Sequence, residues 1–168
     1  MDLKKGQKSR WQAGLLGAAA IAIGPLMVLS TPLKALAETL PLTLTTALTN
    51  GGSVQVTGVT AGRYSLTQLA ARDRHRKLCL GFGDEQPDYT FTLSEPMPQL
   101  QIALDSSGQD TTLLVQGPLG VSCNDNADRS TRDAAISGED WSEGTYRVWV
   151  GSFNSGEQLD YTLRISNP

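Results

Sequence analysis

Residues 144–153 read GTYRVWVGSF and carry the clearest strand pattern in the sequence. The apolar residues at every second position are Tyr146, Val148 and Val150. This period is that of a β-strand with one buried face, so it directs Arg147 and Trp149 to the opposite face. Gly144 permits the tight turn with which such a strand begins. We therefore expect a strand here that contributes one face to a hydrophobic core.

The same alternation recurs along the chain. It covers residues 54–56, 89–93, 100–104 and 159–165. Turns rich in Gly, Pro, Asn and Ser separate these runs, for example at residues 106–108 and 117–118. This punctuation predicts an all-β fold, an antiparallel, jelly-roll-like β-sandwich of about eight or nine short strands. Residues 66–71 favour a turn or two of helix.

Several short motifs follow one another in the second half of the sequence. They are DTTLLV at 110–115, GPLG at 117–120, CND at 123–125, AIS at 135–137, GTYRVWVGSF at 144–153 and YTLRI at 161–165. In this order they resemble the bacterial pre-peptidase C-terminal domain, a secreted β-sandwich often attached to exported proteases, over residues 88–165. Residues 79–88 resemble a stand-alone variant found as small secreted proteins, including in cyanobacteria. The resemblance implies a sandwich with an accessory role and not a peptidase, because the remaining residues leave no room for a protease domain.

The N-terminus has the pattern of a secretory signal peptide. Residues 2–10 contain four basic residues and one acid, residues 13–29 are apolar or small, and residues 35–37 read ALA. We expect a signal peptide over residues 1–37, cleaved before Glu38, and export by the general secretion route. The alternative is an uncleaved membrane anchor, which the short apolar stretch disfavours.

The exported chain is expected to be secreted or periplasmic, without a stable membrane anchor after cleavage. Residues 38–50 form a lead-in arm or strand, and residues 51–168 form the β-sandwich domain. The sequence has 14 Lys and Arg and 17 Asp and Glu. Residues 1–37 contain five of the basic residues and one of the acidic ones, so residues 38–168 contain nine basic and sixteen acidic residues. This acidic balance argues against a nucleic-acid partner, because phosphate recognition needs surplus Lys and Arg.

The sequence contains two cysteines, Cys79 and Cys123, and one histidine, His75. Export to an oxidising compartment permits a disulfide between the cysteines. Two buried free thiols are the alternative. The low counts exclude zinc sites made of four cysteines or of three histidines.

The most polar segment is the loop at residues 123–128, which reads CNDNAD. Its oxygens, with one upstream carboxylate, are candidate Ca²⁺ ligands, since this ion takes about six to eight oxygens. The candidate residues are Asp110, Asn124, Asp125, Asn126 and Asp128. The alternative is a solvated loop whose Asn and Asp side chains bond to the adjacent backbone. We expect no required cofactor, and calcium is the one candidate ion.

Two surfaces are candidates for contact with a partner. The first is a basic stretch made of Arg72, Arg74, His75, Arg76 and Lys77. It either contacts an acidic polysaccharide or a membrane headgroup, or is an exposed loop between strands. The second is the pair Arg147 and Trp149, which offers a flat ring beside a guanidinium to a sugar or peptide. Alternatively, Trp149 lies in a second layer of the sandwich.

No catalytic set is evident, because the sequence lacks G-x-S-x-G, H-E-x-x-H and P-loop motifs. We expect a secreted, non-catalytic β-sandwich accessory module that binds an extracellular protein or polysaccharide. The alternative is a structural, stability or export-aid module for a partner secreted protease, without a ligand of its own.

Overall fold

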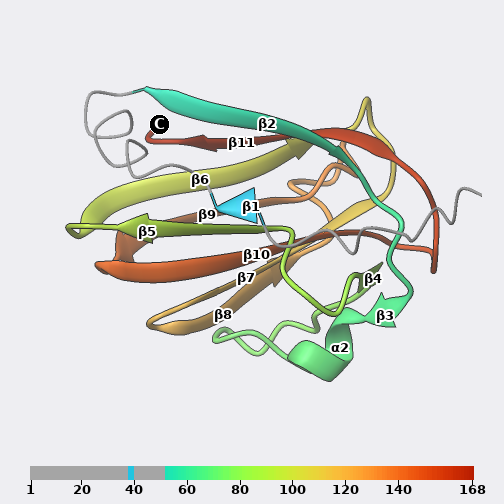
Figure 1. The fold of residues 1–168 in the computed structure, drawn as a ribbon, viewed down its shortest axis with the longest axis horizontal. Helices are drawn as coiled ribbons and strands as arrows, with labels where there is room; N and C mark the ends of the chain where they lie inside the picture. Colours follow the sequence, from blue (N-terminus) through green and yellow to red (C-terminus); the bar gives the residue numbers. More distant parts are fainter. Residues whose placement is uncertain (1–37, 40–51) are drawn as a thin grey trace, which may run out of the picture. The chain divides into compact units, whose positions relative to one another are not determined.

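The structure, a computed structural model, describes residues 38–39 and 52–168 (Figure 1). The expected signal peptide at residues 1–37 and most of the lead-in segment lie outside the described residues. In the described part of the chain, no helix is long and apolar enough to cross a membrane.

The described residues form two β-sheets and a single turn of helix. The longer strands are β2 (Ser53–Val59), β5 (Tyr89–Leu93), β6 (Met97–Asp105), β7 (Thr111–Gly117), β8 (Gly120–Asn124), β9 (Ala135–Trp141), β10 (Gly144–Ser152) and β11 (Asp160–Ser166). The short elements are β1 (Glu38–Thr39), β3 (Tyr64–Ser65), α2 (Leu66–Leu69) and β4 (Phe82–Gly83). The expected all-β class and the short helix are both confirmed.

The small sheet has the order β2-β11-β6-β9 and is antiparallel throughout. The large sheet is built around β10, which pairs with β5 and β4 along one edge and with β7 along the other. Outside these lie β1, β3 and β8. Along the chain the longer strands alternate between sheets except at the β7–β8 hairpin. This order, with first and last strands adjacent, is that of a jelly roll, as predicted.

The main core lies between the two sheets and contains the residues that the period-two pattern assigns to it. Tyr146, Val148 and Val150 of β10 are all buried in this cluster. The rings of Phe91 and Tyr146 stack with their centroids 5.1 Å apart. Opposite them, the small sheet contributes buried residues from β6, β9 and β11. Gly144 has a φ of +132°, a conformation that favours glycine, as the turn before β10 requires.

A second apolar layer covers the outer face of the large sheet. Its buried members are Leu66, Cys79, Leu114, Cys123 and Trp149. The segment that contains β3, α2 and β4 contributes two of these residues, Leu66 and Cys79. The side chain of Trp149 points away from the main core, as the alternation predicts, but it is 5% exposed. The prediction of a solvent-facing Trp149 is therefore wrong, and the second-layer interpretation describes its place.

We expect Trp149→Ala to lower the free energy of unfolding by about 3–5 kcal/mol, because it leaves a cavity in the outer layer. Chemical denaturation of the variant measures this loss. The matched control is Phe153→Ala, three residues beyond Val150, where the side chain is 44% exposed. The control should cost less than about 1 kcal/mol. Equal effects of the two substitutions would contradict a packed outer layer.

Asp88 fills a gap in the pairing of β10, between the end of β4 and the start of β5. One carboxylate oxygen accepts a 2.7 Å hydrogen bond from the backbone N–H of Val150, and the Asp88 N–H donates to the Val148 carbonyl at 2.9 Å. Burial raises the pKa of Asp88 from 3.8 to about 7, the Val150 hydrogen bond opposes this rise, and the charge of Asp84 adds to it. Asp88 is therefore a structural carboxyl that keeps its proton to a higher pH than an exposed aspartate does.

The raised pKa of Asp88 predicts that stability falls as the pH rises from about 4 to about 7. In this window the folded state holds a proton that the unfolded state has lost, so each pH unit costs at most about 1.4 kcal/mol. Asp88→Asn keeps an acceptor for the Val150 N–H and should flatten the dependence. Unfolding measured at several pH values tests this, with Asp160→Asn as the control, since Asp160 is exposed at the start of β11. An unchanged slope in Asp88→Asn would refute the assignment.

Candidate functional site

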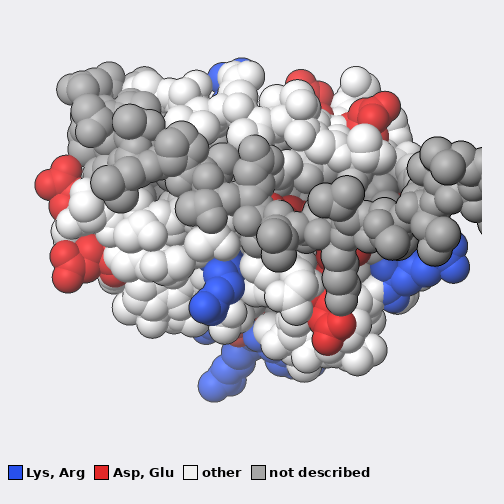
Figure 2. Space-filling view, viewed as in Figure 1, with Lys and Arg blue, Asp and Glu red and all other residues white. Residues whose placement is uncertain are grey.

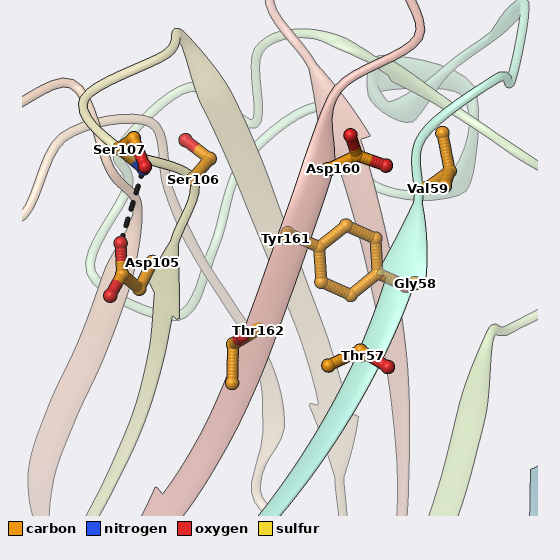
Figure 3. A pocket seen from close by; sticks show the side chains of 9 residues that line it. All are labelled: Thr57, Gly58, Val59, Asp105, Ser106, Ser107, Asp160, Tyr161 and Thr162. Carbon is orange, nitrogen blue, oxygen red and sulfur yellow. Dashed lines mark hydrogen bonds between the residues drawn. The ribbon is translucent and has the colours of Figure 1, made fainter.

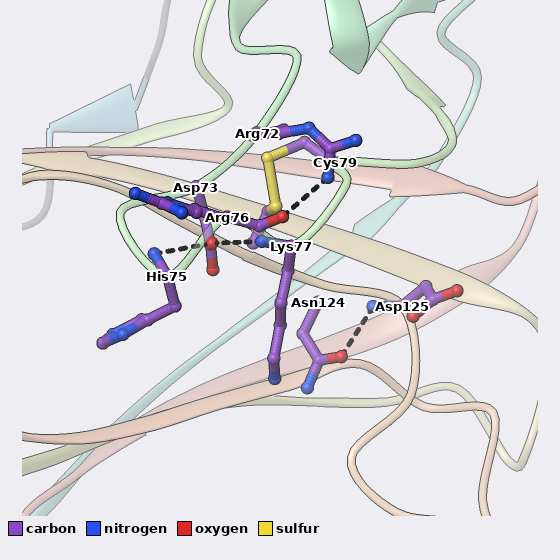
Figure 4. Close-up of a disulfide and its surroundings, with 9 residues drawn as sticks. Arg72, Asp73, His75, Arg76, Lys77, Cys79, Asn124 and Asp125 are labelled. Carbon is purple, nitrogen blue, oxygen red and sulfur yellow. Dashed lines mark hydrogen bonds between the residues drawn. A yellow bond between two sulfur atoms is a disulfide. The ribbon is translucent and has the colours of Figure 1, made fainter.

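The basic loop, Arg72–Lys77, is a tight turn organised by one carboxylate. The buried Asp73 accepts hydrogen bonds of 2.8 Å from the backbone N–H groups of His75 and Lys77. Its own N–H donates to the Lys77 carbonyl at 2.9 Å, and Arg72 closes the turn through Nη1, which donates to the Arg76 carbonyl at 2.8 Å (Figure 4). The loop therefore has a fixed conformation of its own.

The loop is also attached to the large sheet. Cys79 and Cys123 form a disulfide with their Cα atoms 5.4 Å apart, which confirms the predicted bond. A backbone hydrogen bond of 2.9 Å runs from the Arg74 N–H to the Val121 carbonyl of β8. Both attachments join the loop to the β8 strand, at the edge of the large sheet.

We expect the double variant Cys79→Ser with Cys123→Ser to lower the free energy of unfolding by about 4 kcal/mol, since it frees a long loop in the unfolded chain. Denaturant titration of the variant measures the loss. The unreduced, denatured parent protein should release no titratable thiol. Two free thiols in the parent, or an unchanged stability in the variant, would contradict the cross-link.

The cations of the basic loop face solvent. Its exposed side chains are Arg72, Arg74, His75, Arg76 and Lys77. Among the side chains that the structure describes, which leave out that of Glu139, none of these cations forms an ion pair with a carboxylate. The His75 ring contacts Arg74, whose Nε donates to its Nε2 at 3.1 Å. Lys and Arg side chains protrude from the lower edge of the view in Figure 2, the side on which Figure 1 shows α2.

A groove of about 90 Å³ lies between the basic loop and the strands β8 and β9. On the loop side it is lined by Arg74, His75, Lys77 and the shielded Asp73. On the strand side its polar lining residues are Ser122, Asn124 and Ser137. The side chains of His75, Lys77 and Asn124 extend to the same side of the loop (Figure 4). Sequence analysis missed this groove, because its two walls are far apart in the chain.

The polar loop after Cys123 uses its oxygens locally. Asn124 Oδ1 accepts from the backbone N–H groups of Asp125 and Asn126, and its Nδ2 donates to the Ala135 carbonyl at 2.7 Å. Asp128 accepts from the hydroxyl and N–H of Ser130, and the hydroxyl bond holds the pKa of Asp128 below its usual value. These are the bonds of Asx-type turns.

The candidate calcium ligands are not gathered into one acidic cluster. The Asp110 carbonyl accepts from the N–H of Phe153 at 2.9 Å, near the end of β10, whereas Asn124 bonds to the segment that begins β9. In the described part of the chain, no group of three or more His, Cys, Asp or Glu side chains is placed to hold a metal ion. Calcium binding by this loop stays a prediction.

A larger hollow of about 430 Å³ lies on the small sheet, where β2 and β6 end and β11 begins (Figure 3). The charged residues in its lining are Asp105 and Asp160. Asp105 accepts a 3.1 Å hydrogen bond from the N–H of Ser107 and so closes the turn after β6. The hollow is open and acidic, and it would repel an anionic partner.

Arg147 is exposed on β10, but its predicted partner Trp149 is buried within the outer apolar layer. The Trp149 indole N–H donates to the Glu85 carbonyl at 3.4 Å. The proposed flat surface made by the two side chains is therefore not present. The basic loop is the candidate that the structure retains.

The fold and the loop define the class: a jelly-roll β-sandwich whose outer layer carries a disulfide-bonded basic loop. Comparison with protein-family models finds no match, and comparison with curated protein sequences finds none either. Among solved structures, the chain is similar to the pre-peptidase C-terminal domain of a collagenase from Bacillus anthracis, the kind of domain that its motifs resemble. The two share 13% identity with a TM-score of 0.44, over 78% of this chain and 95% of the other.

The chain is also similar to a periplasmic inhibitor of g-type lysozyme from Aeromonas hydrophila. Here the identity is 16% and the TM-score 0.44, over 77% of this chain and 94% of the inhibitor. No residue role is transferred from either structure at this level of similarity.

Proposed function

We propose that this chain is a non-catalytic accessory module that acts outside the cytoplasm and binds an acidic extracellular partner, a polysaccharide or a protein such as a secreted protease. The observation that carries the proposal is the basic loop. It presents four permanent cations, Arg72, Arg74, Arg76 and Lys77, in an otherwise acidic domain. Because Asp73 and the disulfide fix the loop, little conformational entropy is lost when a partner binds.

Location outside the cytoplasm is supported by the signal-peptide pattern of residues 1–37 and by the disulfide. Structural disulfides persist in secreted and periplasmic proteins and are rare in reducing compartments. A non-catalytic role is supported by the environment of the one histidine. The Nε2 atom of His75 already accepts a hydrogen bond from Arg74 Nε, so this nitrogen is not free to take a proton from a substrate.

The test measures binding to immobilised polygalacturonate and to poly-L-glutamate, as probes for an acidic polysaccharide and an acidic protein surface. Replacing the four loop cations by Gln should weaken binding by about tenfold or more. Added salt should weaken binding of the parent more than that of the variant, because exposed charges are screened. The control replaces Arg147 and Arg164, which lie on strands, by Gln.

An equal loss in the control, or no binding of the parent to either probe, would refute the proposal. The structural or export-aid alternative, which has no ligand of its own, would then explain the fold better. Melting temperatures of all variants establish that lost binding does not reflect unfolding.

A further inference from the structure

We propose that the groove between the basic loop and strands β8 and β9 is an oxyanion site, which binds a carboxylate or sulfate group of an acidic polysaccharide. This inference rests on the proposed function and specifies the chemical group that is bound and the residues that bind it. The binding groups are Arg74, His75 and Lys77 from the loop and Ser122, Asn124 and Ser137 from the strands.

The groove is rich in hydrogen-bond donors. Lys77 supplies an ammonium group, and Arg74 supplies guanidinium N–H groups beyond the Nε that donates to His75. Asn124 Nδ2 uses one N–H on the Ala135 carbonyl and has a second one to donate. Ser137 accepts from Gln101 Nε2 at 3.2 Å, so its own hydroxyl proton remains able to donate. A carboxylate or sulfate, which only accepts, complements such a lining.

One carboxylate, that of Asp73, also lines the groove. Its Oδ1 accepts two backbone N–H bonds, and the residue is 8% exposed. Oδ1 of this carboxylate is therefore occupied by the backbone of the loop. The cations Arg74 and Lys77 outnumber it at the groove, so the local charge favours an anion.

The size of the groove selects the group that enters. A volume of about 90 Å³ is well below the roughly 300 Å³ at which pockets for whole small-molecule ligands begin. This is room for one oxyanion group, whereas a sugar ring would lie outside, over the loop. Arg72 and Arg76 are not among the residues that line the groove. They are placed to bind further anionic groups of the same polysaccharide. Repeated contacts along one polymer raise its effective affinity above that of a single residue.

An anionic lipid bilayer is the competing partner. Cys79 is held inward by the disulfide, so its neighbours Leu78 and Leu80 face outward and are 52% and 38% exposed. Exposed leucines beside cations suit a membrane surface. However, the donors of Lys77 and Asn124 line a groove with serine hydroxyls, which a headgroup on a flat surface does not need. The groove therefore favours the polysaccharide.

The test compares two loop variants with the same change of charge. Lys77→Gln removes a cation that lines the groove, and Arg76→Gln removes one beside it. With oligogalacturonate as the probe in calorimetric titrations, Lys77→Gln should weaken binding by about tenfold and Arg76→Gln by less than about threefold. Ser122→Ala changes no charge and should weaken binding by roughly threefold, because it removes one hydrogen-bond donor.

Further probes separate the sources of the oxyanion. Sodium sulfate and monomeric galacturonate should compete only at much higher concentration, sulfated dextran oligomers should bind, and fully methyl-esterified oligogalacturonate should not. Equal losses in Lys77→Gln and Arg76→Gln, with Ser122→Ala unchanged, would overturn the groove while leaving the proposed function intact. Binding to phosphatidylglycerol vesicles without binding to the oligosaccharides would overturn the groove in favour of the bilayer. Failure of the parent protein to bind any anionic polymer would instead refute the proposed function.

Discussion

From Val148 to its end at Ser152, strand β10 is buried on both of its faces, and the rest of the structure depends on this constraint. Its inner face, with Tyr146, Val148 and Val150, fills the space between the sheets. Its outer face carries Trp149, which would expose a large apolar surface unless another segment covered it. The chain between β2 and β5 supplies that cover with Leu66 and Cys79. The basic loop is the part of this covering segment that projects beyond the packed layer.

The disulfide fixes the packing of the outer layer and also the position of the basic loop. Cys79 and Cys123 belong to the outer apolar layer, so their bond fixes the covering segment at the point where it leaves that layer. Leu66 anchors the other end of the segment. The intervening loop is thereby held against β8, and this contact creates one wall of the groove. A single cross-link thus closes the layer over Trp149 and positions the cations.

Much of the fold follows from the sequence, because a period of two residues assigns each side chain of a strand to a face. The core residues of β10 and the ending of β7 at Gly117-Pro118 were predictable for this reason. Alternation does not tell whether the second face of a strand is covered, which is why the sequence left open whether Trp149 faces solvent or a second layer. Nor does it reveal Asp73 as the centre of the basic loop, since that carboxylate acts on backbone groups that any sequence has. The groove joins segments about fifty residues apart and has no local signature.

The arrangement of charge gives the basic loop a physical reason to bind an anion. The four cations Arg72, Arg74, Arg76 and Lys77 lie within six residues and repel one another. Exposure to water weakens the repulsion, and the protein walls of the groove lower the local dielectric, which strengthens the attraction of its cations for an anion. The inward carboxylate of Asp73 holds the backbone together without neutralising the outer side chains. The fold therefore holds these cations close together despite their mutual repulsion. An oxyanion that enters the groove reduces this repulsion, and the site needs little rearrangement to bind it.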